Sequence, residues 1–472
     1  VEAIFYGLFG ISAFSAKLTV LFFALIAVIF WFRLIRLIFD EKVAFYSALL
    51  FTTTPLIVEW SRAVMLETPT LALVIMSVYF FYNFIELRKP RHGYYLIFAT
   101  VAAIYTKQTA IFLIPIFFFY MILSKKYKMF LSLNVIMISF AIFILVLPLA
   151  LVTFKYGSTN ISQTVFENPQ NEPLLEILFS HWSFYPINLF IENQPVLILG
   201  IVTIFLLFVK KKRNIQKITI FFAWVLGFYV TFSYISSKDV RYSCFLIPPF
   251  TLFAALFINE MPLRIRKTSI ASILLVCLFL YQFVISYNLY NPSISGYEKA
   301  AQYIMENEAD TVFFQGTGVG TGSFIFNIRK LDVDRKMVVF RGDKILASSA
   351  LYENRSLVEH VKDRDEVNTL LNAYGSQYYV IEEFADYNIS AYKMLRDVLE
   401  SGNYTLVKKI NKKTSKKELK GAILIYKLGR KNTRTYSYLQ NPLQKLESDS
   451  EKLKRDFIHM RLPIAGTEIT VS

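Results

Sequence analysis

The chain has 472 residues, of which 55% are hydrophobic and 17% aromatic, and its mean hydropathy of +0.43 exceeds what a water-soluble domain usually carries. The formal charge of +16 does not indicate nucleic-acid binding, because most of the 23 Lys and Arg within residues 1–290 lie in short segments between apolar runs. The only two cysteines, Cys244 and Cys277, lie inside apolar runs, so neither a disulfide framework nor a thiolate metal site is supported.

Ten apolar segments have the composition of transmembrane helices when short or tilted spans are counted. They cover approximately residues 17–35, 43–58, 69–85, 94–105, 109–124, 130–153, 195–209, 217–235, 244–259 and 269–288. One alternating set of connecting segments carries 17 Lys and Arg against four Asp and Glu, whereas the other carries six against eight. By the positive-inside rule the first set is cytoplasmic. The sequence therefore predicts a mainly α, polytopic bundle over residues 1–290.

Residues 94–123 can form one long helix or two spans that return at Thr106–Gln108. A single helix would place the basic clusters around Arg88 and Lys125 on opposite sides of the membrane, whereas two spans keep both inside. The two-span interpretation places Lys107 at membrane depth in an external cavity, which makes it a functional candidate.

The same alternation of cytoplasmic and external connecting segments places residue 1 outside, so we expect at least one further span and a first external loop upstream of Val1. Residues 155–194 are expected to form an external loop with a surface helix near Leu174–Phe179. The aromatic run His181–Tyr185 in this loop either anchors at the membrane interface or forms a lid or an acceptor contact.

After residue 290, helix and strand signals alternate and predict a small extracytoplasmic α/β domain over residues 291–430. The expected strands are Thr311–Gln315, Met337–Phe340, Tyr378–Glu382, Tyr404–Lys408 and Ala422–Tyr426, and the expected helices are 296–306, 365–374, 391–401 and one after Gly322. The glycine-rich segment 316–322 lacks the dinucleotide spacing G-x-G-x-x-G and is interpreted as a flexible turn. Residues 431–472 form a polar tail without a readable role.

The segment Glu59–Pro69, which leads into the third span, is the most informative external segment. Pro69 suits the first turn of a helix. Glu67 would then lie at the positive end of the helix dipole, where a carboxylate stays ionised and can accept a proton. The alternative is that Glu67 serves only as a helix cap.

Four of the six external basic residues of the membrane part could bind an anion such as a lipid phosphate or diphosphate. They are Arg62, Lys107, Lys238 and Arg241. Alternatively, they pair with lipid headgroups or with Glu59 and Asp239. Zinc-protease, P-loop and serine-hydrolase motifs are missing from the sequence. No cofactor is therefore indicated, and a divalent cation stays open.

Four short motifs follow one another within residues 1–290: Tyr6–Ser12, Arg62–Pro69, Thr106–Lys107, and Arg241–Tyr242 followed by Pro248–Pro249. Together they resemble motifs of the GT-C membrane glycosyltransferases, which include the dolichyl-phosphate-mannose-protein mannosyltransferases and the aminoarabinose transferase of lipid A. The corresponding family motifs are the segment before the second span, R-x4-D-x-P, a T-K-G turn, and R-Y-x5-P-P at the start of a late span. Here Glu67 takes the place of the aspartate and Gln108 that of the glycine.

The resemblance implies transfer of a sugar from a polyprenyl-phosphate carrier to a protein, lipid or glycan acceptor on the outer side of the membrane, usually with inversion. An acidic residue of the first external loop would act as base or position the acceptor, and that loop would lie upstream of Val1. Among the residues present, Glu67 would be the catalytic carboxylate. The donor's lipid phosphate would be bound by Arg62, Lys107, Arg241 and Tyr242.

Three function classes remain in competition. The leading one is an outward-facing glycosyltransferase embedded in membrane lipids, which uses a polyprenyl-phosphate sugar donor and does not bind nucleic acid. The second is a lipid or polysaccharide flippase, in which the same cations guide a phosphate across the membrane. Transporters often contain internal repeats, and none is visible in this sequence. The third is a receptor or scaffold whose α/β domain binds a partner.

Overall fold

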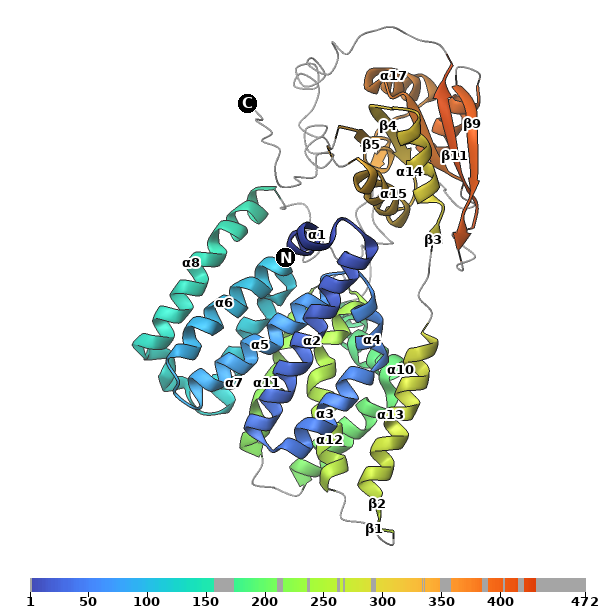
Figure 1. The fold of residues 1–472 in the computed structure, drawn as a ribbon. Coiled ribbons are helices and arrows are strands. Elements are labelled where there is room, and N and C mark those ends of the chain that lie inside the picture. The colour runs from blue at the N-terminus through green and yellow to red at the C-terminus, as the bar shows by residue number, and fades with distance from the viewer. Residues whose placement is uncertain are drawn as a thin grey trace. The chain divides into compact units, whose positions relative to one another are not determined.

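The structure is a computed structural model, drawn as a ribbon in Figure 1. It describes residues 2–156, 174–209, 215–235, 238–260, 264–265, 268–289, 294–332, 334, 336–348, 358–383, 389–401, 404–414 and 420–429. The expected polar tail, 431–472, lies outside the described residues. The chain divides into two compact units, Val1–Tyr290 and Asn291–Ser472. Each unit has hydrophobic core clusters of its own.

The first unit is a bundle of helices with one short antiparallel strand pair, β1 (Arg264–Ile265) and β2 (Thr268–Ser269). The helices are α1 (Glu2–Phe9), α2 (Ala13–Ile38), α3 (Glu41–Thr53), α4 (Pro55–Arg62), α5 (Glu67–Ile85), α6 (Arg91–Thr106), η1 (Gln108–Phe112), α7 (Leu113–Leu123), η2 (Tyr127–Leu131), α8 (Leu133–Tyr156), α10 (Leu174–Val209), α11 (Ile215–Tyr234), η4 (Val240–Leu246), α12 (Ile247–Glu260) and α13 (Ile270–Asn288). Each of the ten expected spans coincides with one of these helices or with two consecutive ones.

Six helices of the described part are individually long and apolar enough to cross a membrane, and counting each bent pair as one span raises the number to eight. The two remaining expected spans are shorter, since α6 has 16 residues and η1 with α7 covers Gln108–Leu123. They form a hairpin: the Tyr120 hydroxyl near the end of α7 donates a hydrogen bond to Glu86, which precedes the start of α6. The chain therefore turns back here instead of forming one long helix, as the two-span interpretation expects, and the apolar helices make the protein an integral, multi-pass membrane protein.

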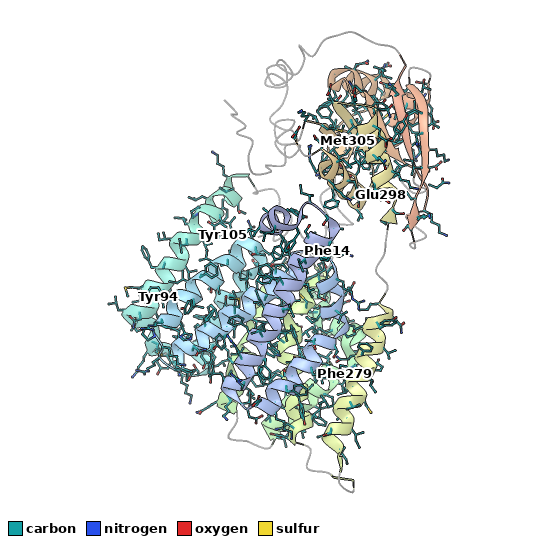
Figure 2. The ribbon with its side chains drawn as sticks, in the orientation of Figure 1. Phe14, Tyr94, Tyr105, Phe279, Glu298 and Met305 are labelled. Atoms are coloured by element: carbon teal, nitrogen blue, oxygen red, sulfur yellow. The ribbon has the colours of Figure 1, made fainter. Side chains whose placement is uncertain are left out.

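The surface of the helical unit carries many apolar side chains. Phe14, Tyr94 and Tyr105 are exposed, and Figure 2 shows them on its outside. Helix α8 packs along α6, as Figure 1 shows, and many of its large apolar side chains are exposed. A soluble monomer rarely exposes so much apolar surface, whereas lipid chains would cover it without cost.

The centre of the bundle is held by aromatic packing. Trp31 of α2 is fully buried and meets Phe221 and Trp224 of α11 edge to face. Its indole N–H donates a hydrogen bond of 3.0 Å to the Ser47 hydroxyl of α3. Because a buried indole N–H without a partner would be costly, this contact fixes α3 against α2.

A proline bends the chain ahead of the candidate site. Helices α3 and α4 meet at 59°, because Pro55 ends the regular hydrogen bonding of α3 and starts α4. Polar groups at the bend contact α13: the Thr53 hydroxyl bonds the Gln282 amide oxygen at 2.9 Å, and the Ser286 hydroxyl bonds the Thr53 carbonyl at 2.8 Å. These contacts fix the direction in which α4 runs toward the start of α5.

The structure describes part of the expected external loop 155–194. Residues 174–194 are helical, as expected for Leu174–Phe179, and belong to α10, which contains Pro186 and Pro195 and bends by 120° between Trp182–Ile191 and Pro195–Leu207 of the next expected span. Tyr185, from the expected aromatic run, is fully buried against Phe228 and Phe232 of α11. The aromatic ring of Tyr185 therefore packs in the bundle core. The remainder of the loop, 157–173, lies outside the described residues.

The second unit is a three-layer α/β domain around the five-stranded sheet β5-β4-β8-β11-β9. Strands β5, β4 and β8 are parallel, and β8, β11 and β9 are antiparallel. The elements are β3 (Ile294–Ser295), α14 (Tyr297–Glu306), β4 (Thr311–Gln315), α15 (Gly318–Leu331), β5 (Val338–Arg341), α16 (Gly342–Ile345), β6 (Ala347–Ser348), β7 (Val358–Glu359), α17 (Arg364–Tyr374), β8 (Tyr378–Glu382), α18 (Ser390–Glu400), β9 (Tyr404–Asn411), β10 (Lys413–Thr414) and β11 (Ala422–Leu428). Figure 1 shows α14 and α15 together, and their apolar residues form one core with the sheet, whereas α17 and α18 belong to the other core.

The glycine-rich segment forms an ordered helix start, so the expected flexible turn is wrong. Helix α15 begins at Gly318, and the hydroxyl of its N-cap Thr317 accepts the N–H of Gly320 at 3.0 Å. The buried carboxylate of Glu382, from the end of β8, accepts the Thr317 N–H at 2.9 Å. A Cβ on Gly320 would lie 1.9 Å from Glu382 Oε1. Glycine is required there because an internal carboxylate occupies the helix N-terminus, the position where dinucleotide folds hold a phosphate.

Candidate functional site

Three helix ends meet at one end of the bundle and bring together four of the five candidate residues. The start of α5 supplies Glu67, the end of α6 is followed by Lys107, and the start of η4 supplies Arg241 and Tyr242. The Lys107 ammonium lies 2.6 Å from Glu67 Oε1, and Nη1 of Arg241 lies 3.5 Å from the same oxygen. One carboxylate oxygen therefore faces two cations.

Burial makes this cluster electrostatically strong. The Glu67 side chain is 1% exposed, whereas those of Lys107 and Arg241 are 17% and 25% exposed. A carboxylate withdrawn from water in this way needs opposite charge nearby. The partly exposed cations can still meet a ligand arriving from outside.

The structure excludes the interpretation of Glu67 as only a helix cap. The N-cap residue of α5 is Leu66, and no side chain caps this helix. The neighbouring Thr68 hydroxyl donates to the Trp60 carbonyl at 2.8 Å. Glu67 is the first residue of α5, so its carboxylate lies at the positive end of the helix dipole as well as beside the two cations.

Lys107 reaches Glu67 because the chain breaks between two helices. Its backbone is extended, with φ −154° and ψ 122°, between the end of α6 and the start of η1. Its ammonium also lies 4.7 Å from the ring centroid of Tyr242, within cation–π range. The Tyr242 ring thus helps to hold the Lys107 ammonium beside Glu67.

Arg241 is held by an acidic residue two positions before it. Asp239 is the N-cap of η4, and its Oδ1 accepts the backbone N–H of Arg241 at 2.9 Å. Its Oδ2 accepts Nε of Arg241 at 2.7 Å and forms an ion pair with Nη2 at 2.5 Å. The sequence named Asp239 only as an alternative ion-pair partner for the external cations. Arg241 pairs with Asp239 and also faces Glu67.

The other two cations that the sequence predicts to be external donate hydrogen bonds to backbone carbonyls at helix ends. Nη1 of Arg62 donates to the Ser286 carbonyl in the last turn of α13 at 3.1 Å, and no ion pair with Glu67 is present there. The Lys238 ammonium donates to three carbonyls at the end of α11, those of Phe232, Ser233 and Ile235, at 2.6, 2.8 and 2.5 Å. Burial lowers the pKa of Lys238 to about 8. A positive charge at a helix C-terminus is stabilising, and this geometry gives both residues a structural role.

Among the described residues, no three His, Cys, Asp or Glu side chains lie together in a way that could hold a metal ion. Within the cluster, the ligands available to an anion are the ammonium of Lys107 and the guanidinium of Arg241. Both groups can donate charge-assisted hydrogen bonds to an anion such as a phosphate.

Comparison with known proteins gives two results. Residues 1–151, about a third of the chain, match the family described as dolichyl-phosphate-mannose-protein mannosyltransferase. No curated protein sequence matches the chain.

Solved structures of ArnT from Cupriavidus metallidurans have the same fold. The apo structure matches with a TM-score of 0.57 at 11% sequence identity, and the structure bound to undecaprenyl phosphate matches with 0.54 at 12%. Each match covers 90% of this chain and 86% of the ArnT chain. In fold, and over residues 1–151 also in sequence, this chain resembles the GT-C membrane glycosyltransferases.

Proposed function

We propose that the protein transfers a sugar from a polyprenyl-phosphate carrier to an acceptor on the extracytoplasmic side of the membrane. The observation that carries this proposal is the pairing of Lys107 and Arg241 around the buried Glu67 carboxylate at one end of the bundle. The likeness to a family named for lipid-phosphate-dependent transfer, and to ArnT bound to undecaprenyl phosphate, supports the same donor class.

The lipid phosphate would bind between the two cations. An ammonium and a guanidinium offer several N–H donors to phosphate oxygens, and such charge-assisted bonds are the stronger ones in proteins. Tyr242 would keep the Lys107 ammonium in place through its ring. Arg62 would act at a distance, by fixing the end of α4 to α13.

Glu67 would serve as the base once Lys107 and Arg241 bind the phosphate instead of its carboxylate. Its carboxylate would then remove the proton of the acceptor hydroxyl while that oxygen attacks the anomeric carbon. The bond between the anomeric carbon and the phosphate oxygen breaks, and the electron pair leaves with the polyprenyl phosphate. Lys107 and Arg241 would stabilise the negative charge that grows on this leaving group.

The placement on the outer side rests on the distribution of charge. The site lies at the end of the bundle where the connecting segments are poor in Lys and Arg. The opposite end carries Lys126, paired with Glu86 at 2.5 Å, within a basic segment. The positive-inside rule assigns that basic end to the cytoplasm.

The test uses the full chain, purified in lipid nanodiscs, with a panel of undecaprenyl-phosphate-linked hexoses and pentoses. Mass spectrometry would measure the appearance of sugar-free undecaprenyl phosphate when membrane extracts are supplied as acceptor. Replacing Lys107 or Arg241 by Ala should lower release about 100-fold, since each loses a charge-assisted contact in the transition state. Glu67→Gln should abolish acceptor-dependent release, and Lys128→Ala, at the opposite end of the bundle, is the matched control.

Two outcomes would oppose the proposal. Unchanged release in the Glu67, Lys107 and Arg241 variants would remove the assigned roles. Movement of intact labelled lipid between leaflets without cleavage of the sugar–phosphate bond would favour a flippase instead.

A further inference from the structure

We propose that Asp239 is the positioning residue of the site, which orients the guanidinium of Arg241 toward the lipid phosphate. This inference rests on the proposed function and assigns a role that sequence motifs did not give to Asp239.

Both oxygens of Asp239 are engaged by Arg241. Oδ1 accepts the backbone N–H, which fixes the first turn of η4, and Oδ2 contacts both Nε and Nη2 of the side chain. One carboxylate therefore sets the backbone position of Arg241 and the plane of its guanidinium together.

The contact also decides which edge of the guanidinium is offered to a ligand. A guanidinium carries five N–H groups in a rigid fork, and Asp239 occupies the edge formed by Nε and Nη2. The Nη1 side then faces Glu67 at 3.5 Å. A phosphate that displaces the Glu67 carboxylate would meet the Nη1 side without any rotation of Arg241.

The residue before Asp239 anchors the segment to a second helix. Lys238 donates to three carbonyls at the end of α11, and its ammonium lies 5.8 Å from the ring centroid of Tyr185. Asp239 itself has extended backbone angles, φ −147° and ψ 130°. Lys238 thus fixes this segment to the end of α11, and Asp239 fixes it to the start of η4. Together these contacts hold the Asp239 carboxylate in position beside Arg241.

Electrostatics alone predicts the opposite effect of removing this carboxylate. Asp239 is a negative charge next to a phosphate site, so its loss would make the site more positive and strengthen the attraction of an anion. A positioning role predicts weaker binding, because Arg241 would lose its preset orientation and need ordering when the ligand binds. The sign of the change therefore separates the two explanations.

The experiment measures binding of undecaprenyl phosphate to the purified full chain by native mass spectrometry titration. In Asp239→Ser the hydroxyl can still cap η4 but is too short to hold the guanidinium, and we expect binding to weaken about 10-fold. Asp239→Asn offers one acceptor oxygen instead of two, so its amide NH2 must face either the backbone N–H or the guanidinium of Arg241, and we expect binding to weaken about 10-fold as well. Arg241→Ala should weaken it about 100-fold.

Binding of undecaprenyl phosphate to a double variant distinguishes a positioning role of Asp239 from a general contribution to the fold. If Asp239 acts through Arg241, Asp239→Ser combined with Arg241→Ala should bind as Arg241→Ala alone does. Tighter or unchanged binding in Asp239→Ser, while Arg241→Ala is weakened, would overturn the positioning role and leave the proposed function intact. Unchanged binding in Arg241→Ala would instead overturn the phosphate-binding role of the proposed function itself.

Discussion

The ion pair between Lys107 and Glu67 allows function and stability to be separated by mutation. In Lys107→Met, the Glu67 carboxylate stays buried at 1% exposure, with Nη1 of Arg241 at 3.5 Å as its remaining cation among the described contacts. Breaking one side of a buried pair costs about 3 kcal/mol or more, because an incompletely compensated charge is left behind. A loss of this size should lower the Tm of the helical unit by roughly 6–12 °C.

The double variant Lys107→Met with Glu67→Gln should recover most of that loss. The neutral amide has little desolvation penalty to offset and nearly the same shape as the carboxylate, so the double variant should melt within about 3 °C of the wild type. It should nevertheless fail to release sugar from undecaprenyl-phosphate donors, because both the base and one phosphate ligand are gone.

The assay is thermal unfolding of the nanodisc-embedded chain followed by tryptophan fluorescence, at one heating rate for all variants because membrane proteins often unfold irreversibly. Trp31 and Trp224 are fully buried in the bundle core and report on the helical unit. A Lys107→Met protein as stable as the wild type would refute the reasoning, as would a double variant that melts no higher than Lys107→Met.

Two further predictions concern the α/β unit and use circular dichroism melting of the full chain. Gly320→Ala should destabilise this unit by about 1–3 kcal/mol, because the added Cβ would lie 1.9 Å from Glu382 Oε1. Gly318→Ala is the control, since its Cβ would meet open space, and it should be neutral or slightly stabilising. Equal effects of the two substitutions would contradict the role given to Glu382. The Glu359 carboxylate accepts hydrogen bonds from the Ser390 hydroxyl and from the backbone N–H groups of Ala391 and Ser390, and these bonds lower its pKa from 4.5. The stability that these bonds contribute is therefore present at neutral pH and is lost as the pH falls below 4.5. Glu359→Gln should therefore melt lower than the wild type at pH 7, and the difference should disappear in acid; a difference independent of pH would refute the assignment.

Helix and strand positions followed from the sequence because they depend on local patterns. Buried runs such as Thr311–Gln315 and Tyr378–Glu382 are strands at the expected residues, and the apolar segments are helices. The hairpin around Lys107 was also predictable. The basic clusters around Arg88 and Lys125 lie just outside its two ends, and the positive-inside rule places both clusters on the same side of the membrane. The helix expected after Gly322 starts five residues earlier, at Gly318, because Glu382, which stabilises that start, comes from a strand far along the chain.

The sequence by itself determined that this chain is a multi-pass helical membrane protein with an α/β domain, and that Glu67 lies at a helix start. Only the tertiary structure decided which cations meet that carboxylate. Arg62, Lys107, Lys238 and Arg241 look equivalent as external basic residues, yet Lys107 and Arg241 reach Glu67 while Arg62 and Lys238 close the ends of α13 and α11. The physical reason is that local sequence fixes where a helix ends, whereas packing between helices distant in the chain fixes which ends lie together.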